Sequence, residues 1–122
     1  MSGPVSARVE RVIDGDTFAV RAQIWLDQEL LVAVRPKGVN APELHGSCRE
    51  EREAAKAART FLASLLAQGD VLLSEIEEDK YSGRVDAIVT LPDGRDLSEI
   101  LLSAGVAVPY DGGRRVAFCA LQ

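Results

Sequence analysis

One long helix, set between runs of extended segments, is the feature that most constrains the fold of this chain. Ser47 followed by Glu50 has the pattern of a capping box at a helix N-terminus, and Gly69 stands where a helix end is expected. Apolar residues between these two signals recur at helical spacing: Ala54, Ala58, Phe61, Leu62 and Leu65. We therefore expect an amphipathic helix between Ser47 and Gly69.

Extended segments are expected on both sides of this helix. Alternating apolar residues in 5–20, interrupted by the turn signature Asp14-Gly15-Asp16, predict a β-hairpin. A third extended segment covers about 29–35, and a fourth and a fifth cover about 71–76 and 84–91. Five short strands with a helix between the third and the fourth are the order of an oligonucleotide-binding (OB) type barrel.

A short second helix is expected after the fifth strand. Asp96 with Glu99 three residues later is another capping-box pattern, and Gly105 is the expected end of the helix. The residues that this helix should bury are Leu97, Ile100, Leu101 and Ala104. Since 122 residues are enough to bury one core, residues 1–122 are expected to form a single domain of the mainly β class with helices (α+β).

The charge balance limits how this chain could hold a nucleic acid. Its net charge is −5 and its pI is near 4.9, whereas non-specific binding to DNA depends on lysines and arginines that neutralise phosphates. Arginines nevertheless lie in or near the predicted strands, at Arg8, Arg11, Arg21, Arg35 and Arg84. Any nucleic acid would therefore have to be held locally, in a positive groove within an acidic surface.

The N-terminus and the cysteines bear on the cellular compartment. No run of eighteen apolar residues is present, and Met1 to Pro4 carry neither the basic nor the apolar region of a leader. The chain is expected to be soluble and cytoplasmic, or secreted or periplasmic if a leader was removed. Cys48 and Cys119 either form a disulfide between the helix start and the C-terminal tail or are separate small core residues. A disulfide would favour an oxidising compartment.

Two carboxylates and two arginines stand beside turns in the β-rich sequence: Asp16, Glu43, Arg35 and Arg84. Phosphodiester hydrolysis passes through a transition state that is more anionic than the substrate. Carboxylates can hold a metal ion and activate water, while planar guanidinium groups can donate paired hydrogen bonds to the growing charge. The combination points to a nuclease.

Each of these residues also has a simpler interpretation. Asp14-Gly15-Asp16 alone is typical of a hairpin turn, Arg35 could form a surface ion pair, and 79–83 could be an ordinary polar turn. His45 is expected to be an exposed loop residue, because no partner motif accompanies it. Trp25 is expected to pack in the core or at its rim rather than to stack on a base.

Three ordered segments resemble the signatures of the staphylococcal nuclease (thermonuclease) family. They are Val12-Ile13-Asp14-Gly15-Asp16-Thr17, then Arg35 with Asn40-Ala41-Pro42-Glu43, then Asp79-Lys80-Tyr81-Ser82-Gly83-Arg84. Their order and spacing fit as well, and the resemblance covers about 8–110. It implies a calcium-dependent phosphodiesterase on an OB-fold barrel that cuts DNA or RNA with little sequence preference.

The resemblance also implies a calcium site with a general base beside it. Asp16 resembles the first calcium carboxylate, Asn40 stands where a second carboxylate is usual, and Ala41 would offer its backbone carbonyl. Glu43 resembles the general base. Because Asn40 keeps an oxygen ligand but lacks the charge of aspartate, calcium affinity is expected to be reduced.

The remaining matched positions concern the substrate. Arg35 and Arg84 resemble the residues that hold the phosphate, and Lys80 and Tyr81 resemble residues that touch the nucleotide. Ser82 is an extra residue in the turn before Arg84, so this arginine is expected to approach the phosphate from a shifted backbone. The expected partner is single-stranded DNA or RNA, bound by a monomer.

Three hypotheses follow from these residues. The first is a metal-dependent nuclease that loses activity in Glu43→Gln. The second is a weakened relative that binds nucleic acid without efficient cleavage, which Asn40 and the acidic pI favour. The third is a protein-interaction module on the same barrel, in which the charged residues are remnants.

Overall fold

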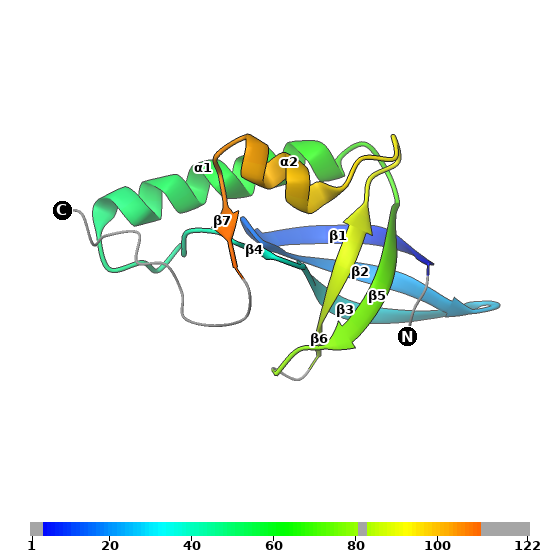
Figure 1. Cartoon of the computed structure of the whole chain (residues 1–122). Helices are drawn as coiled ribbons and strands as arrows, with labels where there is room; N and C mark the ends of the chain where they lie inside the picture. The colour runs from blue at the N-terminus through cyan, green and yellow to red at the C-terminus, as the bar shows by residue number, and fades with distance from the viewer. Residues whose placement is uncertain (1–3, 81–82, 111–122) are drawn as a thin grey trace.

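The computed structural model describes residues 4–80 and 83–110, and the strands among them close into a barrel (Figure 1). The barrel strands are β1 (Val5–Asp14), β2 (Thr17–Trp25), β3 (Gln28–Pro36), β5 (Val71–Glu78) and β6 (Arg84–Thr90). The long helix α1 (Arg49–Leu66) lies between β3 and β5, and α2 (Leu97–Ser103) follows β6. This order confirms the expected OB-type barrel of the mainly β class with helices.

The barrel closes through one parallel and four antiparallel strand pairs, in the order β1-β2-β3-β6-β5. β3 and β6 are the parallel pair, and β5 returns to pair with β1. Alternate residues point inward because side chains alternate across a strand. Phe18, Val34 and Val89, for example, are fully buried inside the barrel. The side chains between them point outward, and most of the polar side chains of the strands lie on this outer face.

Helix α1 begins one residue later than the sequence predicts. Its N-cap is Cys48, whose sulfur accepts from the backbone N–H of Glu51 at 3.4 Å, so the predicted Ser47–Glu50 capping box is wrong. The buried stripe also differs from the prediction at one alanine: Ala55 is buried, whereas Ala54 is exposed. Neighbouring helical residues are about 100° apart around the helix axis, so Ala54 lies off the core face that Ala55 occupies. The buried apolar residues are Ala55, Ala58, Leu62 and Leu66.

Helix α2 agrees more closely with its prediction. The side chain of Asp96 accepts from the backbone N–H of Glu99 at 3.3 Å, as expected for the N-cap. Leu97 and Leu101 are fully buried, whereas Ala104 is exposed at the C-cap and does not belong to the core. In the part of the chain that the structure describes, neither helix is long and apolar enough to cross a membrane.

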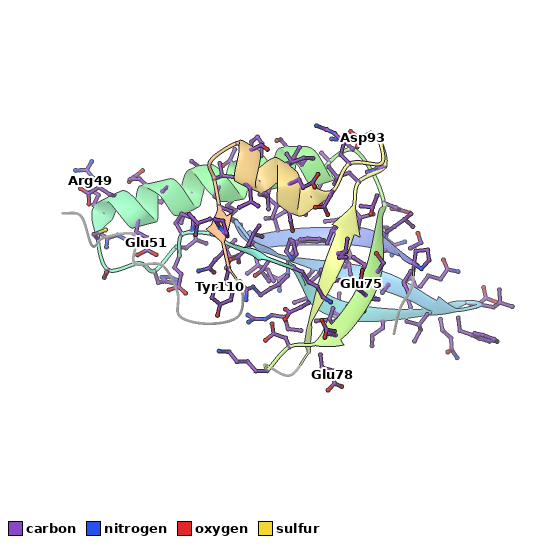
Figure 2. The ribbon with its side chains drawn as sticks, viewed as in Figure 1. Arg49, Glu51, Glu75, Glu78, Asp93 and Tyr110 are labelled. Carbon is purple, nitrogen blue, oxygen red and sulfur yellow. The ribbon has the colours of Figure 1, made fainter. Side chains whose placement is uncertain are left out.

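A small second sheet was not expected from the sequence. β4 (Val39–Asn40) pairs with β7 (Val108–Pro109), and the backbone N–H of Tyr110 donates to the carbonyl of Gly38 at 2.9 Å. Val39 and Asn40 are consequently buried, although 36–43 reads as an irregular loop. The pairing brings Tyr110 beside the end of β3 (Figure 2).

The β2–β3 hairpin extends beyond the rest of the barrel (Figure 1). Its tip carries Trp25, which is 70% exposed, and Leu26, which is 77% exposed, so the expectation that Trp25 packs in the core or at its rim is wrong. The β1 partner of this hairpin ends its pairing at Ala22, several residues short of the tip. No neighbouring strand among the described residues is therefore available to cover the ring.

Candidate active site

A hollow of about 450 Å³ opens where the β1–β2 turn, the end of β3, β4 and the β5–β6 turn meet. It brings together seven of the eight residues predicted for the site: Asp16, Arg35, Asn40, Ala41, Glu43, Lys80 and Arg84. The eighth, Tyr81, and the extra residue Ser82 lie outside the described residues. The predicted disulfide also remains a prediction, because Cys119 lies outside them.

Asp16 is held in place by a close approach between the β1–β2 turn and the rest of the site. A Cβ on Gly15 would lie 2.6 Å from the Cβ of Ala58 on α1 and 2.9 Å from that of Ala41, so the turn requires glycine here. Asp16 itself is 6% exposed. Its Oδ2 accepts from the backbone N–H of Ala41 at 2.8 Å, and its Oδ1 accepts from the hydroxyl of Thr17 at 3.0 Å.

Arg35 links this carboxylate to the β4 segment. Its Nη2 lies 3.4 Å from Asp16 Oδ2, 3.4 Å from the carbonyl of Val39 and 3.3 Å from Asn40 Oδ1. The centre of its guanidinium group lies 5.7 Å from the centroid of the Tyr110 ring, within the range of a cation–π contact. Contacts on several sides therefore hold the Arg35 side chain in the hollow.

The two aspartates of the β1–β2 turn titrate differently. Burial raises the pKa of Asp14 to about 6, and its hydrogen bond with Asp16 and the negative charge of Asp16 act in the same direction. Burial alone would also raise the pKa of Asp16. Hydrogen bonds with Asp14 and the Ala41 N–H, together with the charge of Arg35, outweigh burial and hold the pKa of Asp16 below its ordinary value. Asp16 therefore keeps its negative charge at a lower pH than Asp14, which takes up a proton as the pH falls towards 6.

The oxygen donors around Arg35 are of the chemical type that a hard divalent cation prefers. The Asp16 carboxylate and the Asn40 amide oxygen both lie within 3.4 Å of the same guanidinium nitrogen, so the two oxygens are near each other. Calcium prefers several oxygen ligands of this type. Residues 4–80 and 83–110 contain no group of three or more His, Cys, Asp or Glu side chains placed to hold a metal ion. A cation here would depend on Asn40, the Ala41 carbonyl and water to complete its ligands.

Glu43 is exposed at the mouth of the hollow, and its backbone is fixed by helix α1. The backbone N–H of Glu43 donates to Oε2 of Glu51 at 3.0 Å, and the carbonyl of Glu43 accepts from the N–H of Gly46 at 3.0 Å. Glu51 lies on the first turn of α1, on the side facing this loop (Figure 2). Glu51 was not identified from the sequence as the acceptor for the Glu43 N–H, because the predicted N-cap was Ser47 rather than Cys48.

Arg84 lies at the first residue of β6 and is paired with the turn that precedes it. Its Nη2 lies 3.1 Å from Asp79 Oδ1, and the Asp79 side chain is only 4% exposed. Gly83 has φ +79°, a left-handed conformation that favours glycine, and the N–H of Asp79 donates to the Arg84 carbonyl at 3.1 Å. Arg84 thus lines the hollow despite the extra residue in the turn, and Lys80 is exposed beside it.

Three further residues of the hollow were missed by sequence reasoning: Asp79 as a partner of Arg84, Asp86 and Tyr110. Asp86 could have been found, since it stands two residues after Arg84 and so shares its face of the strand. Burial raises the pKa of Asp86 to about 6, and its hydrogen bond with Asp79 and the charge of Asp79 act in the same direction. Tyr110 carried no local signal.

The chain is thus an OB-type barrel domain whose carboxylates and arginines gather at one hollow. Within that class, a sequence profile of the staphylococcal nuclease homologue family matches residues 33–117, which is most of the chain. The chain belongs to this family. The match includes the segments that carry Arg35, Glu43 and Arg84.

The chain is also similar to two curated proteins, each named "Uncharacterized endonuclease", one from Escherichia coli and one from Escherichia coli O157:H7. Each is 29% identical over 107 residues, which cover 88% of this chain. The aligned part spans 62% of the length of each relative. The chain therefore corresponds to less than two thirds of these longer proteins.

Proposed function

We propose that this protein is a calcium-dependent nuclease that hydrolyses DNA or RNA with little sequence preference. The observation that carries the proposal is the meeting of Arg35, Arg84 and Glu43 with the oxygen donors of Asp16 and Asn40 in one hollow. Family membership and the names of the two relatives support the same reaction class. A barrel alone would carry no such argument, because one fold supports many functions.

Two arginines would bind the phosphate that is attacked. Arg35 and Arg84 enter the hollow from adjacent strands, β3 and β6, which pair in parallel from Ala33 and Arg84 onward. Each guanidinium group can donate paired hydrogen bonds to phosphate oxygens, and these bonds strengthen as negative charge grows on the oxygens. Both side chains contact a carboxylate in the described structure, Asp16 and Asp79 respectively.

Glu43 would remove a proton from the attacking water. Its exposed position at the mouth of the hollow leaves it accessible to solvent, while its backbone is fixed through Glu51. A general base must lie within hydrogen-bonding reach of its proton donor, so a fixed backbone limits the error in its position. The proton would pass from water to a Glu43 carboxylate oxygen as the new phosphorus–oxygen bond forms. The phosphorus–oxygen bond to the leaving nucleoside would break, and the leaving oxygen would take up a proton from solvent.

Asp16, Asn40 and the Ala41 carbonyl would hold the calcium ion. When bound, calcium would polarise the phosphate and orient it against the attacking water. Asp16 is suited to this role because it stays ionised at neutral pH and its carboxylate is oriented by the Ala41 N–H. Lys80 at the rim of the hollow, together with Tyr81, would contact the neighbouring nucleotide of a single-stranded substrate.

A second candidate function is nucleic-acid binding without efficient cleavage. One specific observation favours it: Asn40 supplies a neutral amide oxygen where the family resemblance leads one to expect a carboxylate. Its Oδ1 also lies 3.3 Å from Arg35, which competes with a cation for the same oxygen. At low calcium the protein would then bind a phosphate without hydrolysing it.

A calcium titration tests both candidates. Purified protein is incubated with single-stranded DNA and with RNA across a range of calcium concentrations, with EDTA as the metal-free control. Glu43→Gln tests the base, and Glu78→Gln is the matched control because Glu78 is exposed on β5, outside the residues that line the hollow (Figure 2). Cleavage that needs calcium and is lost only in Glu43→Gln supports the nuclease. Binding without cleavage at every calcium concentration supports the second candidate.

A further inference from the structure

Asp86 lies on the barrel wall between the two arginines of the hollow. In the parallel pairing of β3 and β6, Asp86 is the register partner of Arg35, and it follows Arg84 by two residues. Side chains two residues apart on a strand share a face, as do register partners on adjacent strands. Asp86 therefore faces the same side of the sheet as Arg35 and Arg84.

This position is also shared by two adjoining hollows. Asp86, Arg35 and Tyr110 line both the main hollow and a neighbouring one of about 340 Å³. Asp86 Oδ1 is enclosed and makes no hydrogen bond within the described ranges 4–80 and 83–110. One oxygen of this half-buried carboxyl group is thus shielded from water at the wall of the site.

The charged groups around Asp86 come from every strand packed beside it. Arg35 on β3 and Arg84 on β6 favour its ionised form, while Asp79 opposes that form and shares a hydrogen bond with it. Glu77 on β5 is its other register partner and forms an ion pair with Lys37. The two arginines are consequently the groups that hold negative charge on Asp86.

A phosphodiester bound to Arg35 and Arg84 would alter this balance. The pKa of Asp86 is already raised to about 6, first by burial and then by Asp79. A bound phosphate adds a negative charge and draws on the same two arginines, so it raises the pKa of Asp86 further. The acid would then take up a proton close to neutral pH, in the range where the free protein keeps it ionised.

We propose that Asp86 is the exchangeable counter-ion of the phosphate site: it is ionised in the free protein and takes up one proton from solvent when a phosphodiester binds Arg35 and Arg84. The proposal rests on the proposed nuclease function, because it takes these two arginines as the phosphate site. Asp86 acts through them and is a positioning residue. It makes substrate affinity depend on pH even though a phosphodiester itself does not titrate in this range.

The proposal predicts a particular pH dependence of binding. Uptake of one proton weakens binding as pH rises, by up to about tenfold per pH unit between the pKa of Asp86 in the free protein and its higher pKa in the complex. Asp86→Asn keeps a side chain of similar shape but removes the titration. This variant should bind more tightly than the wild type at pH 8, and its dissociation constant should change little between pH 6 and pH 8.

The probe is a fluorescently labelled single-stranded DNA oligonucleotide without terminal phosphates. Its dissociation constant is measured from pH 5.5 to 8.5 by anisotropy, in EDTA so that no turnover occurs, and again with calcium in a Glu43→Gln background. Calorimetry of the wild type in buffers with different ionisation enthalpies counts the protons directly and needs no Asp86 variant. Asp93→Asn is the matched charge control, since Asp93 is exposed in the turn between β6 and α2 (Figure 2).

Two other residues could give a pH-dependent affinity and need their own variants. Histidine is the side chain that most commonly changes charge between pH 5 and 8, so His45→Gln is included. Asp14→Asn tests the other carboxyl group of the hollow whose pKa is raised. Loss of the pH slope only in Asp86→Asn, with about one proton taken up by the wild type, supports the proposal.

The opposite outcomes separate this proposal from the nuclease function. A pH slope that persists in Asp86→Asn, or that is lost in His45→Gln or Asp14→Asn instead, overturns the role of Asp86 and leaves the nuclease function standing. Absence of proton uptake in the calorimetric measurement does the same. Absence of oligonucleotide binding at every pH, with and without calcium, overturns both.

Discussion

The carboxylate of Glu51 accepts a hydrogen bond from the backbone N–H of Glu43, with 3.0 Å between nitrogen and Oε2. Glu51 is only 9% exposed, and its own backbone N–H donates to the sulfur of Cys48 at the start of α1. One side chain thus joins the helix N-terminus to the loop that carries the proposed base. A negative charge at a helix N-terminus is also favourable for the helix.

Glu51→Ala should reduce the rate of cleavage more than the affinity for substrate. Loss of the carboxylate leaves the part-buried N–H of Glu43 without this acceptor and lets the loop move, which costs about 1–3 kcal/mol. We expect kcat to fall roughly tenfold or more, because displacement of a positioned group by a fraction of an ångström is costly. Steady-state kinetics on single-stranded DNA measures the effect.

Glu51→Gln is the control for this prediction, because its amide oxygen can still accept from Glu43. It should recover most of the lost rate. If both variants retain wild-type kcat, Glu51 does not position the base, and if both lose it equally, the charge of Glu51 rather than its hydrogen bond is what matters.

Asn40→Asp should increase calcium affinity. The substitution adds a negative charge to an oxygen donor that already faces Asp16 across the Arg35 guanidinium group. Affinity at carboxylate sites rises with the number of charged ligands, and an increase of about tenfold or more is expected. Calcium titration followed by calorimetry, and the calcium concentration that gives half-maximal cleavage, both measure it.

The same variant should be less stable than the wild type when calcium is absent. Asn40 is 1% exposed, so an aspartate there would bury a second charge beside Asp16. The melting temperature in EDTA should fall and should recover when calcium is added. A calcium affinity that does not change in Asn40→Asp would contradict the assignment of residue 40 as a metal ligand.

The three local motifs could be predicted from the sequence because each is a contiguous segment whose chemistry is carried by neighbouring residues. Asp16, Arg35, Asn40, Glu43 and Arg84 do meet in one hollow. The strand–helix order was equally accessible, since alternation and helical spacing are short-range patterns.

The features that were missed depend on contacts between distant segments. Tyr110 reaches the site only because β7 pairs with β4, two strands of two residues each, which are too short to show a periodic pattern. Trp25 was misjudged because a large apolar residue on a strand usually packs, whereas this hairpin extends past its neighbours. Its exposure follows from strand length, which sequence alternation does not specify.

Asp86→Asn should stabilise the protein at neutral and alkaline pH. The pKa of Asp86 is about 6 in the folded protein against an ordinary value of 3.8, so between these values the unfolded chain binds fewer protons than the folded one. Ionisation of Asp86 therefore lowers the stability of the wild type as pH rises from about 4 to beyond 6. Asparagine cannot ionise, and its advantage over aspartate should grow across this interval and then level off.

Urea unfolding of the wild type and Asp86→Asn from pH 4 to pH 8 measures this difference. Asp93→Asn is the control of opposite sign, because the Arg95 backbone N–H and side chain hold the pKa of the exposed Asp93 below its ordinary value. Its substitution should not stabilise the protein at any pH. A stability difference between wild type and Asp86→Asn that stays constant with pH would show that Asp86 does not titrate as described.

Gly15→Ala should destabilise the protein and weaken calcium binding together. The added Cβ would lie 2.6 Å from the Cβ of Ala58 and 2.9 Å from that of Ala41, so the β1–β2 turn must move away from α1. Overpacking of this kind costs about 1–3 kcal/mol. The movement also carries Asp16 away from the Ala41 N–H that orients its carboxylate.

A double-mutant cycle with Ala58→Gly isolates that contact. Ala58→Gly alone costs about 1 kcal/mol through helix propensity, but it removes the closer of the two clashing atoms. The double variant should therefore be more stable than the sum of the single effects predicts, by about 1 kcal/mol or more, with the clash against Ala41 remaining. Strict additivity in urea unfolding would mean that the turn does not pack against α1 at this point, and calcium affinity would then have to be explained without that support.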